Sequence, residues 1–159
     1  RRAANWRVPW TMSGSVALRN HLAPYAASRG KRLYRKAVGG LVNARSVIEA
    51  LAADIIDVGP LDSYYHDLLR HNEPDLAEKV RVVATTSAMP IPPFVATAVL
   101  DSEQLQRLRA ALLSVATANE LQATRECLLL AGFACPEPAD YDVLASIADS
   151  PIPNHLEEF

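Results

Sequence analysis

Strand-like and helix-like spacings of apolar residues alternate over the first half of the chain. Short apolar runs bounded by Gly, Pro or polar residues indicate strands, and apolar residues three or four positions apart indicate helices. Pro24 is expected to interrupt or bend the first helix, because proline has no N–H to donate. The alternation predicts an α/β fold in the order βαβαβαβ. The expected strands are residues 6–10, 32–38, 55–58 and 80–85, and the expected helices begin at Ser15, Asn43 and Asp62.

The spacing of apolar residues along the chain changes after residue 89. Pro90, Pro92 and Pro93 forbid a helix and favour an extended crossover. One further strand is expected at residues 94–100, and the helices that follow it have no strands between them. Two of these helices are expected to begin with capping boxes, formed by Asp101 with Gln104 and by Asn119 with Gln122. The second of these helices is expected to stop at Gly132, and a last helix is expected to begin at Asp140.

Composition narrows the class of protein. The 159 residues are 50% hydrophobic, which is enough for one sizeable core or two small ones. The net charge of −2 lacks the basic excess of a nucleic-acid-binding protein. The longest apolar runs, at residues 94–100 and 128–133, are far shorter than the roughly 20 residues of a membrane helix. We therefore expect no nucleic-acid partner and no membrane-spanning segment.

The residues give no sign of a metal site, a cofactor or catalysis. Cys127 and Cys135 lack a Cys-x-x-Cys spacing and a nearby pair of His, so we expect two buried thiols, with a disulfide as the alternative. The chain has no Gly-x-Ser-x-Gly elbow, no phosphate-binding Gly-x-x-x-x-Gly-Lys loop and no Gly-x-Gly-x-x-Gly fingerprint. These features favour a non-enzymatic protein without metal or cofactor.

Three loops, each between a strand and a helix, form the candidate site. They span residues 11–15, 39–43 and 59–63, and small or capping residues in each leave backbone N–H groups accessible. Helix starts carry partial positive charge, and in an open α/β sheet such loops collect at one edge. We therefore expect Ser13, Asn43 and Asp62 to converge on a common anion. Ordinary helix capping is the alternative for each loop.

Several side chains near these loops have two interpretations. Asp62 would repel a bound oxyanion unless a proton or an amine lies between them, or it merely caps its helix. Arg45 either donates to the oxyanion or is solvated on the polar face of its helix. The remaining aromatic side chains are interpreted structurally: Tyr64 and Tyr65 as core and rim residues, and His66 and His71 as surface histidines.

The order of these motifs resembles a known family. Thr11-x-Ser13-Gly14 is followed by Gly39-Gly40, by the run Arg45-Ser46-Val47-Ile48-Glu49-Ala50-Leu51-Ala52, and then by Asp57-Val58-Gly59-Pro60-Leu61-Asp62. This arrangement, over about residues 5–117, resembles the periplasmic phosphate- and phosphonate-binding proteins of ABC transporters. The resemblance implies a type II periplasmic-binding-protein fold that closes over an oxyanion and delivers it to a membrane permease.

Carried over by position, the resemblance implies specific ligand contacts. Asp62 matches the ligand-side aspartate, and Ala44 stands where a His is often found, beside Asn43. The implied ligand-binding residues are Thr11, Ser13, Gly14, Ser15, Asn43, Ala44 and Asp62.

The resemblance also implies an organisation and a location. Residues 1–90 would form the ligand-binding α/β lobe, and residues 91–159 the crossover strand and the C-terminal helices that return to the other lobe. Most of the first lobe would be lacking, so we expect weak or no anion binding, which a sub-micromolar affinity would contradict. The expected location is the periplasm or a lipid anchor, with membrane contact only through the permease. The alternative function is an effector-sensing domain of a transcription regulator or sensor kinase.

Overall fold

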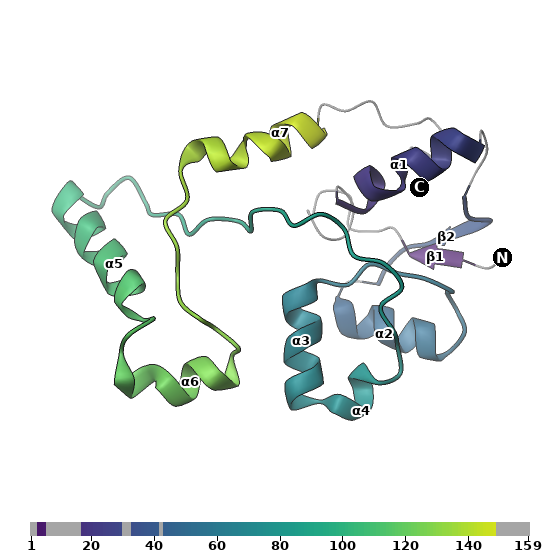
Figure 1. Cartoon of the computed structure of the whole chain (residues 1–159), viewed down its shortest axis with the longest axis horizontal. Helices are drawn as coiled ribbons and strands as arrows, with labels where there is room; N and C mark the ends of the chain where they lie inside the picture. Colours follow the sequence, from purple (N-terminus) through teal and green to yellow (C-terminus); the bar gives the residue numbers. More distant parts are fainter. Residues whose placement is uncertain (1–2, 6–16, 30–32, 42, 149–159) are drawn as a thin grey trace. The chain divides into compact units, whose positions relative to one another are not determined.

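The computed structural model describes residues 3–5, 17–29, 33–41 and 43–148. Two compact units are distinguished by their internal contacts (Figure 1). The first unit contains the described residues up to Met89 and those from Asp142 onward. The second unit is Pro90–Tyr141. Each unit is described separately below.

The first unit contains a short parallel pair of strands. β1, Ala3–Asn5, pairs with β2, Lys36–Val38, in the register Ala3 to Lys36 (Figure 1). The strand expected at residues 6–10 lies outside the described residues. The strand expected at residues 32–38 is shorter than predicted, because only its last part pairs with a neighbour.

Helix α1, Ala17–Arg29, runs between these strands in the sequence. Pro24 lies inside it, and of the two effects expected there the interruption is wrong because α1 continues to Arg29, while the bend stays a prediction. Proline removes one N–H donor, but its fixed φ of about −65° is itself helical, so the neighbouring turns can remain. Ala17 and Ala26 are the buried residues of α1, whereas Tyr25 is 57% exposed.

Four more helices of the first unit follow β2, and three of them lie before Met89. These three are α2, Ala44–Ala52, α3, Ser63–Asn72, and the single turn α4, Pro74–Ala77. The predicted helix starts at Asn43 and Asp62 are confirmed, since each side chain caps its helix. One core cluster joins Val47, Ala50 and Ile56; the other joins Ile48, Leu69, Leu76 and Ala77.

Two expected strands of the first unit are wrong. Residues 55–58 form no continuous strand: Val58 makes only an isolated β-bridge, and Ile56 is buried against α2. Residues 80–85 are also without regular structure, and Val82 and Val83 are 63% and 64% exposed. A strand needs a hydrogen-bonded partner, which an apolar run alone does not supply.

The second unit contains one longer helix and three shorter helical segments. They are α5, Ser102–Ser114, the 3₁₀ turn η2, Asn119–Leu121, and α6, Gln122–Cys127, followed by the 3₁₀ turn η3, Pro138–Tyr141. The capping box of Asp101 and Gln104 is confirmed, with Asp101 Oδ1 accepting from Gln104 N at 2.8 Å. The one expected at Asn119 and Gln122 is wrong, because neither η2 nor α6 has a side-chain cap.

Other helix boundaries after residue 89 also differ from the predictions, including that of α7, Asp142–Ala148, which belongs to the first unit. α6 ends at Cys127 rather than near Gly132, and α7 starts after the η3 turn rather than at Asp140. The strand expected at residues 94–100 is wrong, since this stretch pairs with no other strand in the described part of the chain. Phe94 instead meets Phe133 in an edge contact with ring centroids 5.6 Å apart.

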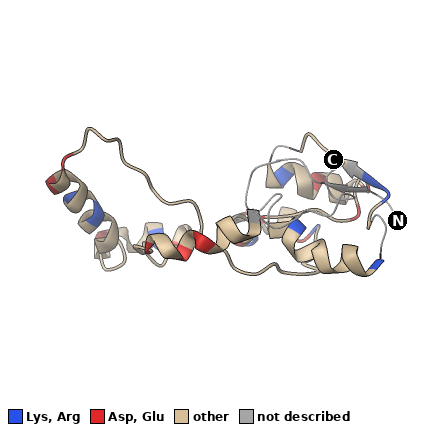
Figure 2. Cartoon of the chain, turned by 90° about the horizontal axis from the view of Figure 1, so that it is seen from above, with Lys and Arg blue, Asp and Glu red and all other residues tan. Residues whose placement is uncertain are grey.

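Surface features complete the description. Cys127 and Cys135 are exposed free thiols, so the expectation that they are buried is wrong and the alternative of a disulfide is excluded. Acidic and basic residues occur together on α2, α3 and α5 (Figure 2). Among the described residues, no helix combines the length and apolar character required to cross a bilayer.

Candidate functional site

Four of the seven expected ligand-binding residues lie outside the described part of the chain. They are Thr11, Ser13, Gly14 and Ser15, which precede α1. The convergence of their loop with the loops of Asn43 and Asp62 therefore stays a prediction. The structure describes the other three residues, and it places them at the N-termini of α2 and α3.

Asn43 forms the N-cap of α2. Its Oδ1 accepts hydrogen bonds from Ser46 N at 2.9 Å and from Ser46 Oγ at 3.2 Å. These bonds fix the amide so that its Nδ2 donor faces away from the cap. The N–H groups of the first two helical residues, Ala44 and Arg45, have no intrahelical acceptor, as at any helix start. The start of α2 thus presents an exposed amide and two backbone donors to an anion.

The loop before α2 depends on glycine at one position. Gly40 has a φ of 85°, which residues with a side chain rarely adopt. A methyl group there would meet no atom within 4 Å, so the requirement comes from the backbone conformation alone. Gly40 therefore directs the chain from β2 into the N-cap of α2.

Asp62 caps α3 in the same manner. Its Oδ1 accepts from Tyr65 N at 2.8 Å, and the side chain is exposed. Among the hydrogen bonds of the described residues, the second carboxylate oxygen takes part in none. The capping interpretation is confirmed for Asp62, and one oxygen stays accessible to an external donor. Such an oxygen favours a ligand that carries a proton or an ammonium group.

α2 and α3 belong to one packed body. Ile48 of α2 and Leu69 of α3 belong to the same buried cluster, and Leu61, which precedes the Asp62 cap, packs against both clusters of this unit. Because the helices share a core, the two N-termini are carried on a common support. Their positions are set by packing rather than by the loops alone.

Arg45 is engaged by an acidic side chain. Its Nη2 lies 2.6 Å and 2.7 Å from the two carboxylate oxygens of Glu73, the residue between α3 and α4. This hydrogen bond and the charge of Glu73 raise the pKa of Arg45, with a smaller contribution from Tyr65. Both partners are partly exposed, at 42% and 46% of their side-chain surface. Arg45 is therefore an ion-pair partner of Glu73 in which both side chains keep contact with solvent.

The aromatic residues of α3 differ in part from the sequence expectations. His66 is only 8% exposed, so its assignment to the surface is wrong, whereas His71 is exposed as expected. Nε2 of His66 has no hydrogen-bond partner among the described residues. Tyr64 and Tyr65 are 47% and 37% exposed, so neither is a core residue. His66 lies three residues before the buried Leu69 on the same helix face, a spacing that could have indicated its burial.

The starts of α2 and α3 offer hydrogen-bonding groups of opposite kinds. Donors occur at the start of α2, an acceptor occurs at the start of α3, and the described residues contain no cluster that could hold a metal ion. The chemistry available is that of hydrogen bonding and charge complementarity.

Comparison with known proteins agrees with this chemistry. Residues 8–142 match the family of periplasmic substrate-binding proteins of phosphonate ABC transporters. No curated protein matches the chain. The matched family is a transport family rather than an enzyme class, and its periplasmic members imply a location outside the cytoplasm. The resemblance inferred from the motifs is confirmed: the chain belongs to the phosphonate-binding periplasmic substrate-binding proteins, and it is a substrate-binding component of an ABC transporter.

Proposed function

We propose that the chain binds phosphonate, phosphate or a related oxyanion and presents it to the permease of its ABC transporter. The single observation that carries this proposal is the family match, which extends over the candidate loops. The proposed ligand-binding residues are Thr11, Ser13, Gly14, Ser15, Asn43, Ala44 and Asp62.

The donors at α2 support an oxyanion as the ligand. Asn43 Nδ2 and the N–H groups of Ala44 and Arg45 are of the type that binds phosphate oxygens at helix starts. Ala44 has no donor in its side chain, so its contribution would come from its backbone. The pairing of Arg45 with Glu73 leaves recognition to these neutral groups.

Asp62 supports selectivity among oxyanions. A carboxylate repels a bound dianion and so weakens its binding. The same carboxylate accepts a hydrogen bond from a protonated oxyanion or attracts an ammonium group. The accessible Oδ2 of Asp62 would thus favour an aminoalkylphosphonate over methylphosphonate. Residues 1–90 are proposed as the α/β ligand-binding lobe and residues 91–159 as the crossover and helices of the other lobe, with the protein in the periplasm or anchored there by lipid.

The proposal is tested by a titration with matched variants that keep each helix cap. Asn43→Ser retains an N-cap oxygen but removes the amide donor, and Asp62→Asn retains the cap but removes the charge. Phosphate, phosphite, methylphosphonate and 2-aminoethylphosphonate are added while the backbone amide signals are followed by NMR. Asp101→Asn, at the cap of α5, is the control.

The expected results separate the two roles. Asn43→Ser should weaken all four ligands by roughly three- to tenfold, the effect of about one hydrogen bond. Asp62→Asn should strengthen methylphosphonate binding and weaken 2-aminoethylphosphonate binding. Equal preferences in the wild type and Asp62→Asn would remove the selectivity proposal. Binding of an oxyanion that shifts amides elsewhere in the chain but not those of residues 43–46 would overturn the binding site.

A further inference from the structure

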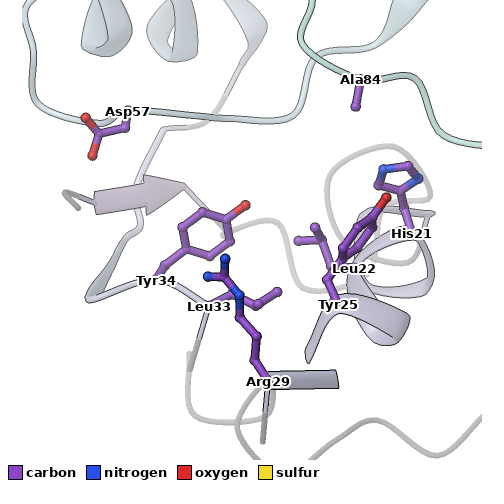
Figure 3. Close-up of a pocket in the computed structure, with 8 residues that line it drawn as sticks. All are labelled: His21, Leu22, Tyr25, Arg29, Leu33, Tyr34, Asp57 and Ala84. Carbon is purple, nitrogen blue, oxygen red and sulfur yellow. The ribbon is translucent and has the colours of Figure 1, made fainter. Parts of the chain in front are cut away.

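A cavity beside α1 has a lining that the oxyanion proposal does not use. Its volume is about 720 Å³, within the range typical of small-molecule sites. His21, Tyr25 and Arg29 line it at intervals of four residues, so they share one face of α1. Tyr34 and Asp57 contribute from other segments of the same unit (Figure 3).

Arg29 supplies a positive charge to this cavity. It lies in the last turn of α1, where the helix dipole favours a cation. No carboxylate among the described residues pairs with its guanidinium. Figure 3 shows the guanidinium directed toward Tyr34, whereas the carboxylate of Asp57 does not point toward it. With respect to the described residues, the forked donors of Arg29 can receive an anionic group, for which a carboxylate has the matching planar geometry.

Aromatic rings form the adjoining walls. The rings of His21 and Tyr25 have centroids 6.0 Å apart and are tilted by 45°. Tyr34 is half-buried, and burial raises the pKa of its phenol, which keeps its ring neutral. Rings of this kind contact a flat aromatic ligand through their faces and edges.

We propose that this cavity binds a small aromatic carboxylate, with the carboxylate on Arg29 and the ring against Tyr25, His21 and Tyr34. Asp57 is the acidic residue of the lining and opposes an anion, so it limits the affinity without removing the site. The inference uses none of the proposed oxyanion-binding residues. It adds a second ligand class to a transport protein.

Benzoate is the probe, and two analogues separate its features. Cyclohexanecarboxylate retains the charge without the aromatic ring, and benzyl alcohol retains the ring without the charge. The 159-residue chain is titrated with each compound while its amide signals are followed by NMR. Arg29→Gln removes the proposed anchor, and Arg19→Gln makes the same change on α1 outside the cavity.

We expect benzoate to shift the amides of residues 21–34 and to bind more tightly than either analogue. Arg29→Gln should weaken benzoate by about tenfold, the usual effect of losing a charge-assisted hydrogen bond, while Arg19→Gln leaves it unchanged. Asp57→Asn should strengthen binding severalfold. Tyr25→Ser should weaken benzoate more than cyclohexanecarboxylate.

Other outcomes overturn the inference. It fails if Arg29→Gln and Arg19→Gln bind benzoate equally, if benzyl alcohol binds as tightly as benzoate, or if the shifts fall outside residues 21–34. A methylphosphonate titration of the same sample distinguishes the two proposals. Shifts at residues 43–46 with methylphosphonate alone would retain the oxyanion site and reject the aromatic site, and shifts near α1 with benzoate alone would do the reverse.

Discussion

The contact between α2 and α3 gives the sharpest stability prediction. Ile48 is 0% exposed and packs against Leu69, Leu76 and Ala77. Ile48→Ala removes the Cγ1, Cγ2 and Cδ1 atoms, which at about 0.8 kcal/mol for each buried carbon amounts to about 2.4 kcal/mol. The cavity left behind adds to this loss, so we expect the free energy of unfolding to fall by about 3 kcal/mol.

The chain offers a matched control for this substitution. Ile55 belongs to the same unit but is 56% exposed, so Ile55→Ala should change the free energy of unfolding by less than about 0.5 kcal/mol. Urea unfolding is followed by far-UV circular dichroism, and hydrogen exchange of the α3 amides reports on this unit separately. Equal effects of Ile48→Ala and Ile55→Ala would refute the packing of α2 on α3.

The remaining predictions concern the second unit. Asp101→Ala should destabilise α5 by about 1 kcal/mol through loss of the capping box, measured as faster hydrogen exchange in α5, and an unchanged rate would contradict the cap. Gly132→Ala should lower the free energy of unfolding by at least about 1 kcal/mol, because Gly132 has a φ of 154° and a Cβ there would lie 2.7 Å from Ala116 Cβ. Thermal unfolding measures this loss, and an unchanged melting temperature would contradict this geometry. Cys127 and Cys135 should both be alkylated by iodoacetamide without denaturant, and protection of either thiol in a mass spectrum would contradict their exposure.

Helix starts were predictable because their determinants are local. Asn43, Asp62 and Asp101 each bond to a backbone N–H three residues later, so a short window of sequence contains both partners. At Asn119 the prediction from the same spacing was wrong, because a 3₁₀ turn forms there instead of a capped helix start. The spacing permits a capping box but does not require one.

Strands and burial were less predictable because they depend on distant partners. The apolar run at residues 94–100 has strand propensity, but no local signal states whether another strand pairs with it. The pairing of Arg45 with Glu73 joins residues 28 positions apart. The sequence therefore indicated that Arg45 could donate hydrogen bonds, but it did not indicate Glu73 as the acceptor. The role of the Ser13 loop in ligand binding stays a prediction that depends on the resemblance of its motif.

The exposed apolar run after the prolines has a consequence for how the chain behaves at high concentration. Phe94, Val95 and Val99 are 78%, 89% and 89% exposed, and residues 94–100 contain neither a charge nor a proline. Such a segment can join identical segments of other molecules into a cross-β assembly. Pro93 on one side and Asp101 on the other restrict how far that assembly can extend along the chain. These two flanking residues therefore act as gatekeepers against aggregation, a role independent of ligand binding.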